Sequence, residues 1–122
     1  MKDNVTAVIA ASANIKGIHC DGDPGLLAAV RHYFPSVPIQ LCVFHKYSRA
    51  GSIIPFIRTK TKLDKEIKQR TEKVLFAKSK AEALMALKDL ERYAREHQSY
   101  DKLQKLIGVL KRNFDLLLTH FD

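Results

Sequence analysis

The sequence predicts an α/β unit followed by an all-helical segment, in a chain that is mostly helical overall. Three observations lead to this prediction. Two short apolar segments, at 17–20 and 37–44, lie on either side of a segment with helical spacing. From about Lys62 onward the chain contains no proline and a single glycine, Gly108. Apolar residues in that second part recur at the three- and four-residue spacing of amphipathic helices.

The first part of the chain predicts a helix–strand–helix–strand order. The expected segments are a helix at 3–15, a buried strand at 17–20, a helix from Pro24 to Phe34 and a strand at 37–44. Asp23 before Pro24 is typical of a helix start, with aspartate as N-cap and proline at the first helical position. A helix that connects two strands predicts that these strands are parallel and adjacent.

The second part predicts three amphipathic helices, at 62–77, 80–97 and 100–118. Ser79 and Glu82 have the spacing of a capping box at the start of the middle helix. The residues expected on the buried faces are Leu63, Ile67, Val74, Ala77, Ala83, Leu84, Leu87, Leu90, Ala94, Leu103, Leu106, Ile107, Leu110, Phe114 and Leu117. We therefore expect two domains, 1–50 and 51–122.

Composition and charge narrow the function classes. Hydrophobic residues make up 46% of the chain, which is ordinary for a globular protein. No apolar run approaches the roughly 20 residues of a membrane span, so no membrane partner is expected. A polar start and two cysteines favour a reducing, cytoplasmic location. The net charge of +8 lies mainly in residues 51–122, with sixteen basic and ten acidic residues, and favours nucleic acid as partner.

The candidate chemistry lies at the carboxyl ends of the predicted strands, where open α/β sheets form their sites. Asp21 directly follows the first strand, and its carboxylate suits a hard divalent cation such as Mg²⁺. The alternative for Asp21 is a turn aspartate at a strand–helix junction. Asp23 is a second, accessory candidate, although its cap role explains it without a metal.

Cys42 and His45 follow the second strand with a spacing that can place a thiolate and an imidazole on one metal. One such pair is half of a zinc site, and His19 with Cys20 would have to supply the other half. Neighbouring residues of a strand point to opposite faces, which weakens that arrangement. We favour a buried cysteine and a histidine hydrogen-bonded at a helix start, and do not expect zinc.

Taken together, these segments resemble the second-aspartate region of Mutator-type and related insertion-sequence transposases, which are DDE-type enzymes with an RNase H-like fold. In that family a strand ends in Asp-Gly, a helix ends in a Phe-Pro turn, and the next strand ends in Gln-x-Cys-x-x-His. The matching stretches here are 18–27 (IHCDGDPGLL), 29–30 (AV), 34–35 (FP) and 40–46 (QLCVFHK). The similarity covers about residues 3–50 closely.

The resemblance implies a partial RNase H-like unit over residues 1–50 and the all-helical insertion of such enzymes over the rest. It places Asp21 at the second catalytic aspartate, a ligand for Mg²⁺ or Mn²⁺ in DNA strand cleavage and transfer. It places Cys42 and His45 close to the catalytic centre. The family's first aspartate and last glutamate have no counterpart in this chain, and two-metal chemistry needs several carboxylates. We therefore expect a fragment or truncated copy of a mobile element's transposase, inactive alone.

The expected partner is DNA, either as the transposon end or as the target. A homo-oligomer is a further possibility. Basic residues concentrate at Arg58, Lys60, Lys62, Lys65, Lys68, Arg70 and Lys73. Lys62, Lys65 and Lys73 fall near one helical face, which suits phosphate contacts that are insensitive to base sequence. The alternative is a solvated helix with i,i+4 ion pairs. Two other functions fit the sequence: a small basic nucleic-acid-binding protein without catalysis, and a zinc-stabilised interaction domain.

Overall fold

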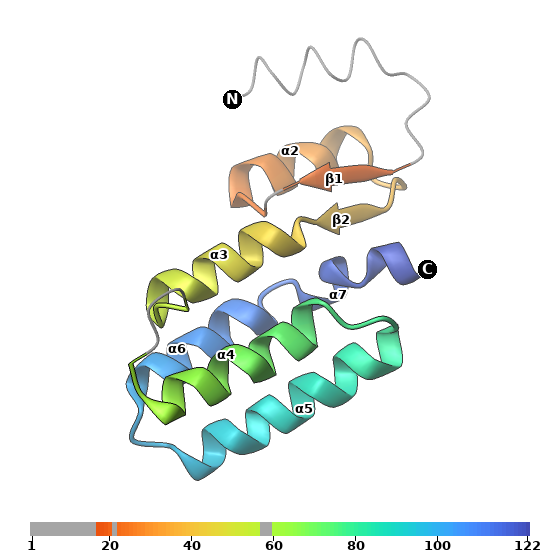
Figure 1. Ribbon diagram of the computed structural model, residues 1–122. Helices are drawn as coiled ribbons and strands as arrows, with labels where there is room; N and C mark the ends of the chain where they lie inside the picture. The colour runs from red at the N-terminus through yellow and green to blue at the C-terminus, as the bar shows by residue number, and fades with distance from the viewer. Residues whose placement is uncertain (1–16, 21, 57–59) are drawn as a thin grey trace.

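The computed structural model describes residues 17–20, 22–56 and 60–122, whose arrangement is shown in Figure 1. Of these residues 69% are helical and 6% lie in strands, so the prediction of a mostly helical chain is confirmed. The helix predicted at 3–15 lies outside them. The elements are β1 (Ile18–Cys20), α2 (Pro24–Tyr33), β2 (Ile39–Leu41), α3 (Val43–Ile53), α4 (Lys62–Leu75), α5 (Lys80–Glu96), α6 (Asp101–Lys111), α7 (Phe114–Leu117) and the 3₁₀ turn η1 (Thr119–Phe121).

β1 and β2 form a parallel pair connected by α2, as predicted. Ile18 pairs with Ile39, and Cys20 pairs with Leu41. β1 is less buried than expected, because His19 at its centre is exposed to solvent. β2 is buried on one face, which packs into the core. The strand–helix–strand unit at the start of the described chain is therefore confirmed.

The second strand is shorter than predicted, because a helix that the sequence did not predict begins directly after it. β2 ends at Leu41, and α3 starts at Val43 where the strand was expected to continue to Phe44. No side chain caps the start of α3. The helix packs against α4 and α6 (Figure 1), and this tertiary contact compensates for its weak local signals. The division expected between residues 50 and 51 falls inside α3.

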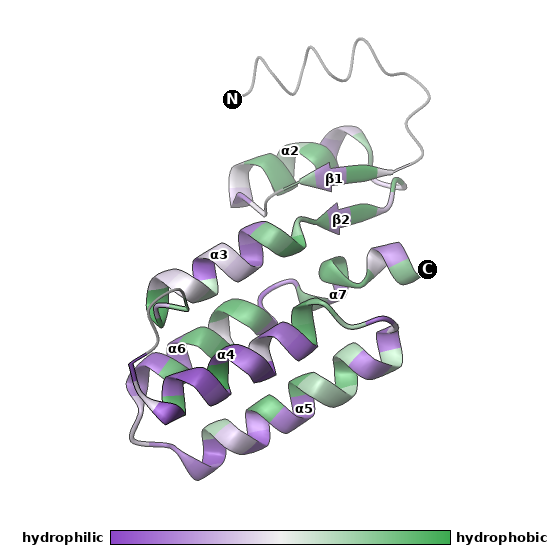
Figure 2. Ribbon diagram, in the orientation of Figure 1, coloured by the Kyte–Doolittle hydropathy of each residue, from purple (hydrophilic) through white to green (hydrophobic). Residues whose placement is uncertain are grey.

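The helices of the second part begin where the sequence predicted them. Figure 2 shows that α4, α5 and α6 each carry both hydrophobic and hydrophilic stretches. Ser79 caps α5 by accepting a 3.1 Å hydrogen bond from the Glu82 amide, as expected for a capping box. The Glu82 carboxylate accepts from the Lys78 amide, one residue before the amide that a capping box uses. The part of the capping box formed by Ser79 is therefore confirmed, and the part formed by Glu82 is shifted by one residue.

Two predictions for the helical part are wrong. Leu84, placed on the buried face of α5, is 42% exposed. The helix expected at 100–118 is divided, because α6 ends at Lys111 and Asn113 adopts a left-handed conformation with φ of 53°. Asparagine tolerates this conformation better than most residues do, and it allows the chain to change direction before α7.

One apolar core connects the sheet to the helices. Leu27 of α2 and Leu41 of β2 belong to the same cluster as the buried leucines of α5 and α6. The fully buried large side chains include Leu41, Ile54, Ile67, Leu90, Leu103, Leu106 and Leu110. In the part of the chain that the structure describes, no helix is long and apolar enough to cross a membrane.

The last residues of the chain lie along the edge of β2 that faces away from β1 (Figure 1). Gln40 donates a 2.8 Å side-chain hydrogen bond to the Leu117 carbonyl and accepts one of 2.6 Å from the His120 amide. The Thr119 hydroxyl donates a 2.6 Å bond to the Ile39 carbonyl. The outer edge of β2 is therefore hydrogen-bonded by the C-terminal segment.

Candidate functional site

The carboxyl ends of β1 and β2 are joined directly, as the candidate site requires. The Cys42 amide donates a 2.7 Å hydrogen bond to the Cys20 carbonyl. Asp21, the candidate catalytic residue and metal ligand, lies outside the described residues, and its role stays a prediction. Gly22 has a φ of 92°, which favours glycine, and a Cβ there would lie 3.5 Å from a methyl carbon of Leu41. Gly22 therefore lies close to the Leu41 side chain at the end of β2.

Asp23 is the N-cap of α2. Its Oδ1 accepts hydrogen bonds from the amides of Gly25 at 2.8 Å and Leu26 at 3.4 Å. These bonds satisfy two backbone donors that the first turn of a helix leaves without partners. The cap interpretation, which the sequence favoured over an accessory metal ligand, is confirmed.

Cys42 and His45 lie at the start of α3 and not at the end of a longer strand. Cys42 occupies the N-cap position, and a hydrogen bond from the His45 side chain lowers the pKa of its thiol. The thiol is half-buried and His45 is exposed. The expectation of a histidine hydrogen-bonded at a helix start therefore describes His45 correctly. Proximity to His45 therefore makes the Cys42 thiol easier to deprotonate than that of an ordinary cysteine.

The proposed zinc ligands are brought together only in part, because Cys42 and His45 are hydrogen-bonded to each other. Among the residues that the structure describes, no three His, Cys, Asp or Glu side chains gather as ligands for one metal ion. All four candidates for the zinc-stabilised domain lie among those residues. Cys20 and Cys42 are not joined in a disulfide, and both are half-buried.

The predicted DNA-binding segment presents an exposed basic face on α4. Lys60, Lys62, Lys65 and Lys73 are exposed, Lys68 is half-buried, and Arg58 lies outside the described residues. Within the described chain no lysine of α4 forms an ion pair. Asp64 instead accepts a 2.6 Å hydrogen bond from the Tyr100 hydroxyl, and Glu72 accepts one of 2.8 Å from Tyr47. The i,i+4 ion pair expected of the solvated-helix alternative is formed by Glu66 and Arg70, while the described lysines of α4 take no part in ion pairs.

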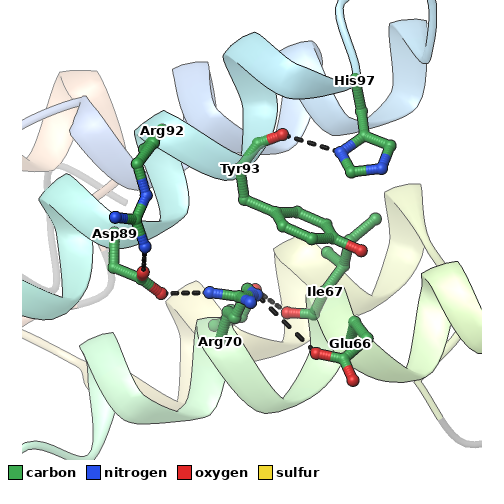
Figure 3. A network of polar contacts seen from close by, with 8 residues as sticks. Glu66, Ile67, Arg70, Asp89, Arg92, Tyr93 and His97 are labelled. Carbon is green, nitrogen blue, oxygen red and sulfur yellow. Dashed lines mark hydrogen bonds and ion pairs between the residues drawn. The ribbon is translucent and has the colours of Figure 1, made fainter.

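Arg70, which the sequence grouped with the DNA-binding residues, is used inside the protein (Figure 3). Its guanidinium donates to Asp89 of α5 and lies 4.3 Å from the centre of the Tyr93 ring. Asp89 also accepts a 2.6 Å hydrogen bond from Arg92, and Glu66 lies 3.8 Å from Arg70 Nε. The side chain of Arg70 thus connects α4 to α5, and its guanidinium is engaged by Asp89 and Tyr93 within the protein.

Lys46 is a charged residue whose position the sequence did not reveal. It is 8% exposed, and its Nζ donates hydrogen bonds to the carbonyls of Val109 at 2.9 Å and Arg112 at 3.0 Å. Burial, with Arg49 and Arg112 nearby, lowers its pKa to about 8. In the sequence, the signal for Lys46 is its position directly after the Cys-x2-His motif. The carbonyls that accept its hydrogen bonds lie more than sixty residues further along the chain.

No family model matches the chain, and no curated protein or solved structure matches it either.

Proposed function

We propose that this chain is part of the catalytic region of a DDE-type DNA transposase, whose complete form cleaves and transfers DNA strands in the cytoplasm or nucleoid. The observation that carries the proposal is the hydrogen bond between Cys42 and Cys20. This bond joins the Asp-Gly and Cys-x2-His segments, which are separate in sequence, at the carboxyl ends of two parallel strands. Ligand sites of open α/β sheets form at this position.

The two edges of the sheet support the same proposal. The outer edge of β2 is hydrogen-bonded by the C-terminal segment through Gln40 and Thr119. A further strand of a larger sheet would therefore pair with β1. In the transposase family that the chain resembles, the strand that bears the first catalytic aspartate belongs inside the sheet. The edge of β1 that faces away from β2 is the place where that strand would pair.

The carboxylates of this chain are not expected to make a complete two-metal site. Asp23 uses its Oδ1 to cap α2, which leaves Asp21 as the main candidate ligand. Several carboxylates are needed to hold two ions and to orient the attacking oxygen. The chain alone is therefore proposed to bind Mg²⁺ or Mn²⁺ weakly and to leave DNA uncleaved.

Titration with paramagnetic Mn²⁺ tests the proposed metal ligand. The amide NMR signals of Cys20, Gly22 and Cys42 should broaden first, because Asp21 lies next to these residues in the sequence or across the joined strand ends. Asp21→Asn should abolish the broadening, since it removes the negative charge that a hard cation requires.

Asp23→Asn is the matched control for this titration. Asparagine is also a good N-cap, so α2 should keep its stability and the broadening should persist. Broadening that survives Asp21→Asn, or that centres on another part of the chain, contradicts the proposal. Metal-dependent DNA cleavage that disappears in Asp21→Ala would show that the site is more complete than proposed.

The exposed lysines of α4 favour a second candidate function, DNA binding without catalysis. Their charges have no ion-pair partner among the described residues. Such a face is expected to bind duplex DNA weakly and without sequence preference, with dissociation constants on the order of 10⁻⁴–10⁻⁶ M at physiological salt.

Charge reversal of Lys62, Lys65 and Lys73 to glutamate tests the α4 face. Binding of a labelled duplex should weaken, and the slope of log K against log salt concentration should decrease by about one for each phosphate that the variant no longer binds. Reversal of Lys88, Arg95 and Lys102, which are exposed on α5 and α6, changes the net charge equally and measures its effect alone. If the α4 variant behaves like the wild type at low salt, the lysine face is only a solvated surface.

A further inference from the structure

A groove with a volume of about 400 Å³ lies between α3 and α6. Four of its lining residues are basic, namely Lys46 and Arg49 from α3, Lys105 from α6 and Arg112 directly after α6, and none is acidic. Arg49, Lys105 and Arg112 are exposed to solvent. The groove therefore brings together cations from two helices that are about sixty residues apart in sequence.

Acidic side chains of the described residues do not neutralise these cations. Across the described ranges, none of the four forms an ion pair with an acidic side chain. Lys46 at the base of the groove uses two of its three N–H bonds on the carbonyls of Val109 and Arg112. Arg49 and Arg112 contribute, after burial, to the lowered pKa of Lys46, which shows that like charges are crowded here. A bound anion would relieve this repulsion.

Gly108 keeps one wall of the groove open. It lies inside α6, where a glycine costs about 1 kcal/mol relative to alanine. Close packing does not explain this residue, because a Cβ at Gly108 would have no atom within 4 Å outside its own helix backbone. The missing side chain leaves space between Lys105 and Arg112 that a ligand can enter.

We propose that this groove binds consecutive phosphate groups of a nucleic acid backbone. Arg112 directly follows α6 and lies seven residues after Lys105, a separation of about 10 Å at the rise of a helix, which is longer than one phosphate group. Arginine forms paired hydrogen bonds with phosphate oxygens, and lysine adds a point charge. The proposal shares only the ligand class with the function proposed above, because it depends neither on Asp21 nor on the lysines of α4.

Paired charge reversals test the electrostatic part of the proposal. Arg49→Glu combined with Lys105→Glu should weaken binding of a short labelled DNA duplex roughly tenfold and lower the salt slope by about two. Lys88→Glu combined with Arg95→Glu on α5 changes the net charge equally and should have a much smaller effect. Equal losses in the two double variants overturn the proposal, since net charge alone would then explain binding. So does wild-type affinity in the groove variant.

A steric pair at Gly108 tests the groove without changing charge. Gly108→Leu should fill the space beside Arg112 and weaken DNA binding roughly tenfold, while circular dichroism shows an intact helical fold. Gly108→Ala should bind like the wild type and be about 1 kcal/mol more stable, because alanine favours the helix. Wild-type affinity of the leucine variant overturns the proposal. An equal loss in both variants does so as well, because stiffening of α6 would then be the cause.

Competition experiments identify the ligand class. Unlabelled duplex should displace the labelled one and shift the NMR signals of Gly108 and Val109, and sodium pyrophosphate should shift the same signals at much higher concentration. A shift with pyrophosphate alone overturns the nucleic acid proposal in favour of a small-anion site. Polyglutamate that competes as well as DNA at equal charge concentration overturns it in favour of an acidic protein partner.

Discussion

Leu90→Ala should lower the free energy of unfolding by about 2–5 kcal/mol, a large share of the stability of a domain of this size. Leu90 is 0% exposed in the middle of α5. Truncation removes apolar contacts and leaves a cavity that the helices around it fill only in part. Urea denaturation followed by circular dichroism measures the loss.

Leu84→Ala is the matched control on the same helix. The sequence placed Leu84 on the buried face with Leu90, but the structure leaves it 42% exposed. Its truncation should change the free energy of unfolding by less than about 1 kcal/mol. Similar losses for the two variants would show that the buried face of α5 is not the one described here.

The second large effect is expected from the deprotonation of Lys46. It should increase the free energy of unfolding between about pH 8 and pH 10. In the unfolded chain Lys46 keeps its proton up to the ordinary pKa of 10.5, and in the folded chain only up to about 8. The unfolded state therefore binds more protons in this range, and stability rises with pH. The difference is at most about 3 kcal/mol, and solvent that reaches the ammonium group through the groove reduces it.

Above pH 10 the trend should reverse. Burial, together with hydrogen bonds to Glu72 and Asp64, raises the pKa of Tyr47 and Tyr100 from 10.0 to about 12. The folded state then keeps protons that the unfolded chain loses, so stability falls as pH rises. The combined contribution of Lys46, Tyr47 and Tyr100 to stability is therefore expected to be largest at about pH 10.

The Lys46→Met variant isolates the lysine contribution. Other lysines of the chain also lose charge at high pH, and that effect is present in both proteins. The difference in unfolding free energy between wild type and variant should change steadily from about pH 8 to pH 10, because only the wild type loses a buried charge. Urea midpoints measured across this range provide the comparison, and a difference that stays constant with pH would contradict it.

Helix starts with capping side chains could be predicted from the sequence because their determinants are local. Asp23 and Ser79 bond to amides two or three residues away, and both caps are found where they were predicted. The start of α3 has no such side chain. The apolar run before it continues from β2, so the sequence favours a longer strand, and the packing of α3 against α4 and α6 decides the outcome.

The position of Leu84 shows the limit of helical periodicity. Ala83, Leu87, Leu90 and Ala94 lie within a narrow stripe when successive residues are placed about 100° apart, and all four are buried. Leu84 lies about 100° from Ala83 on that projection. Its hydrophobicity matches the stripe but its angle does not, and the packing of neighbouring helices determines how wide the buried stripe is.

The candidate site could be predicted only in part. The meeting of the Asp-Gly and Cys-x2-His segments follows from the parallel pairing of two strands, which a connecting helix favours. The burial of Lys46 depends on carbonyls of α6, and the internal use of Arg70 depends on Asp89 and Tyr93 of α5. Charge and periodicity in one segment contain no information about such distant partners.

The covering of β2 by the C-terminal segment has a consequence for the order of folding. The Ile39 carbonyl receives its hydrogen bond from Thr119, eighty residues later in the chain. A contact of such long sequence separation forms slowly, because the loop that it closes must lose much of its freedom first. Until then β2 presents an open strand edge to other chains, and such edges favour aggregation. Synthesis of the entire helical array must therefore precede protection of the sheet, and helices and sheet are expected to reach their native state as one cooperative unit.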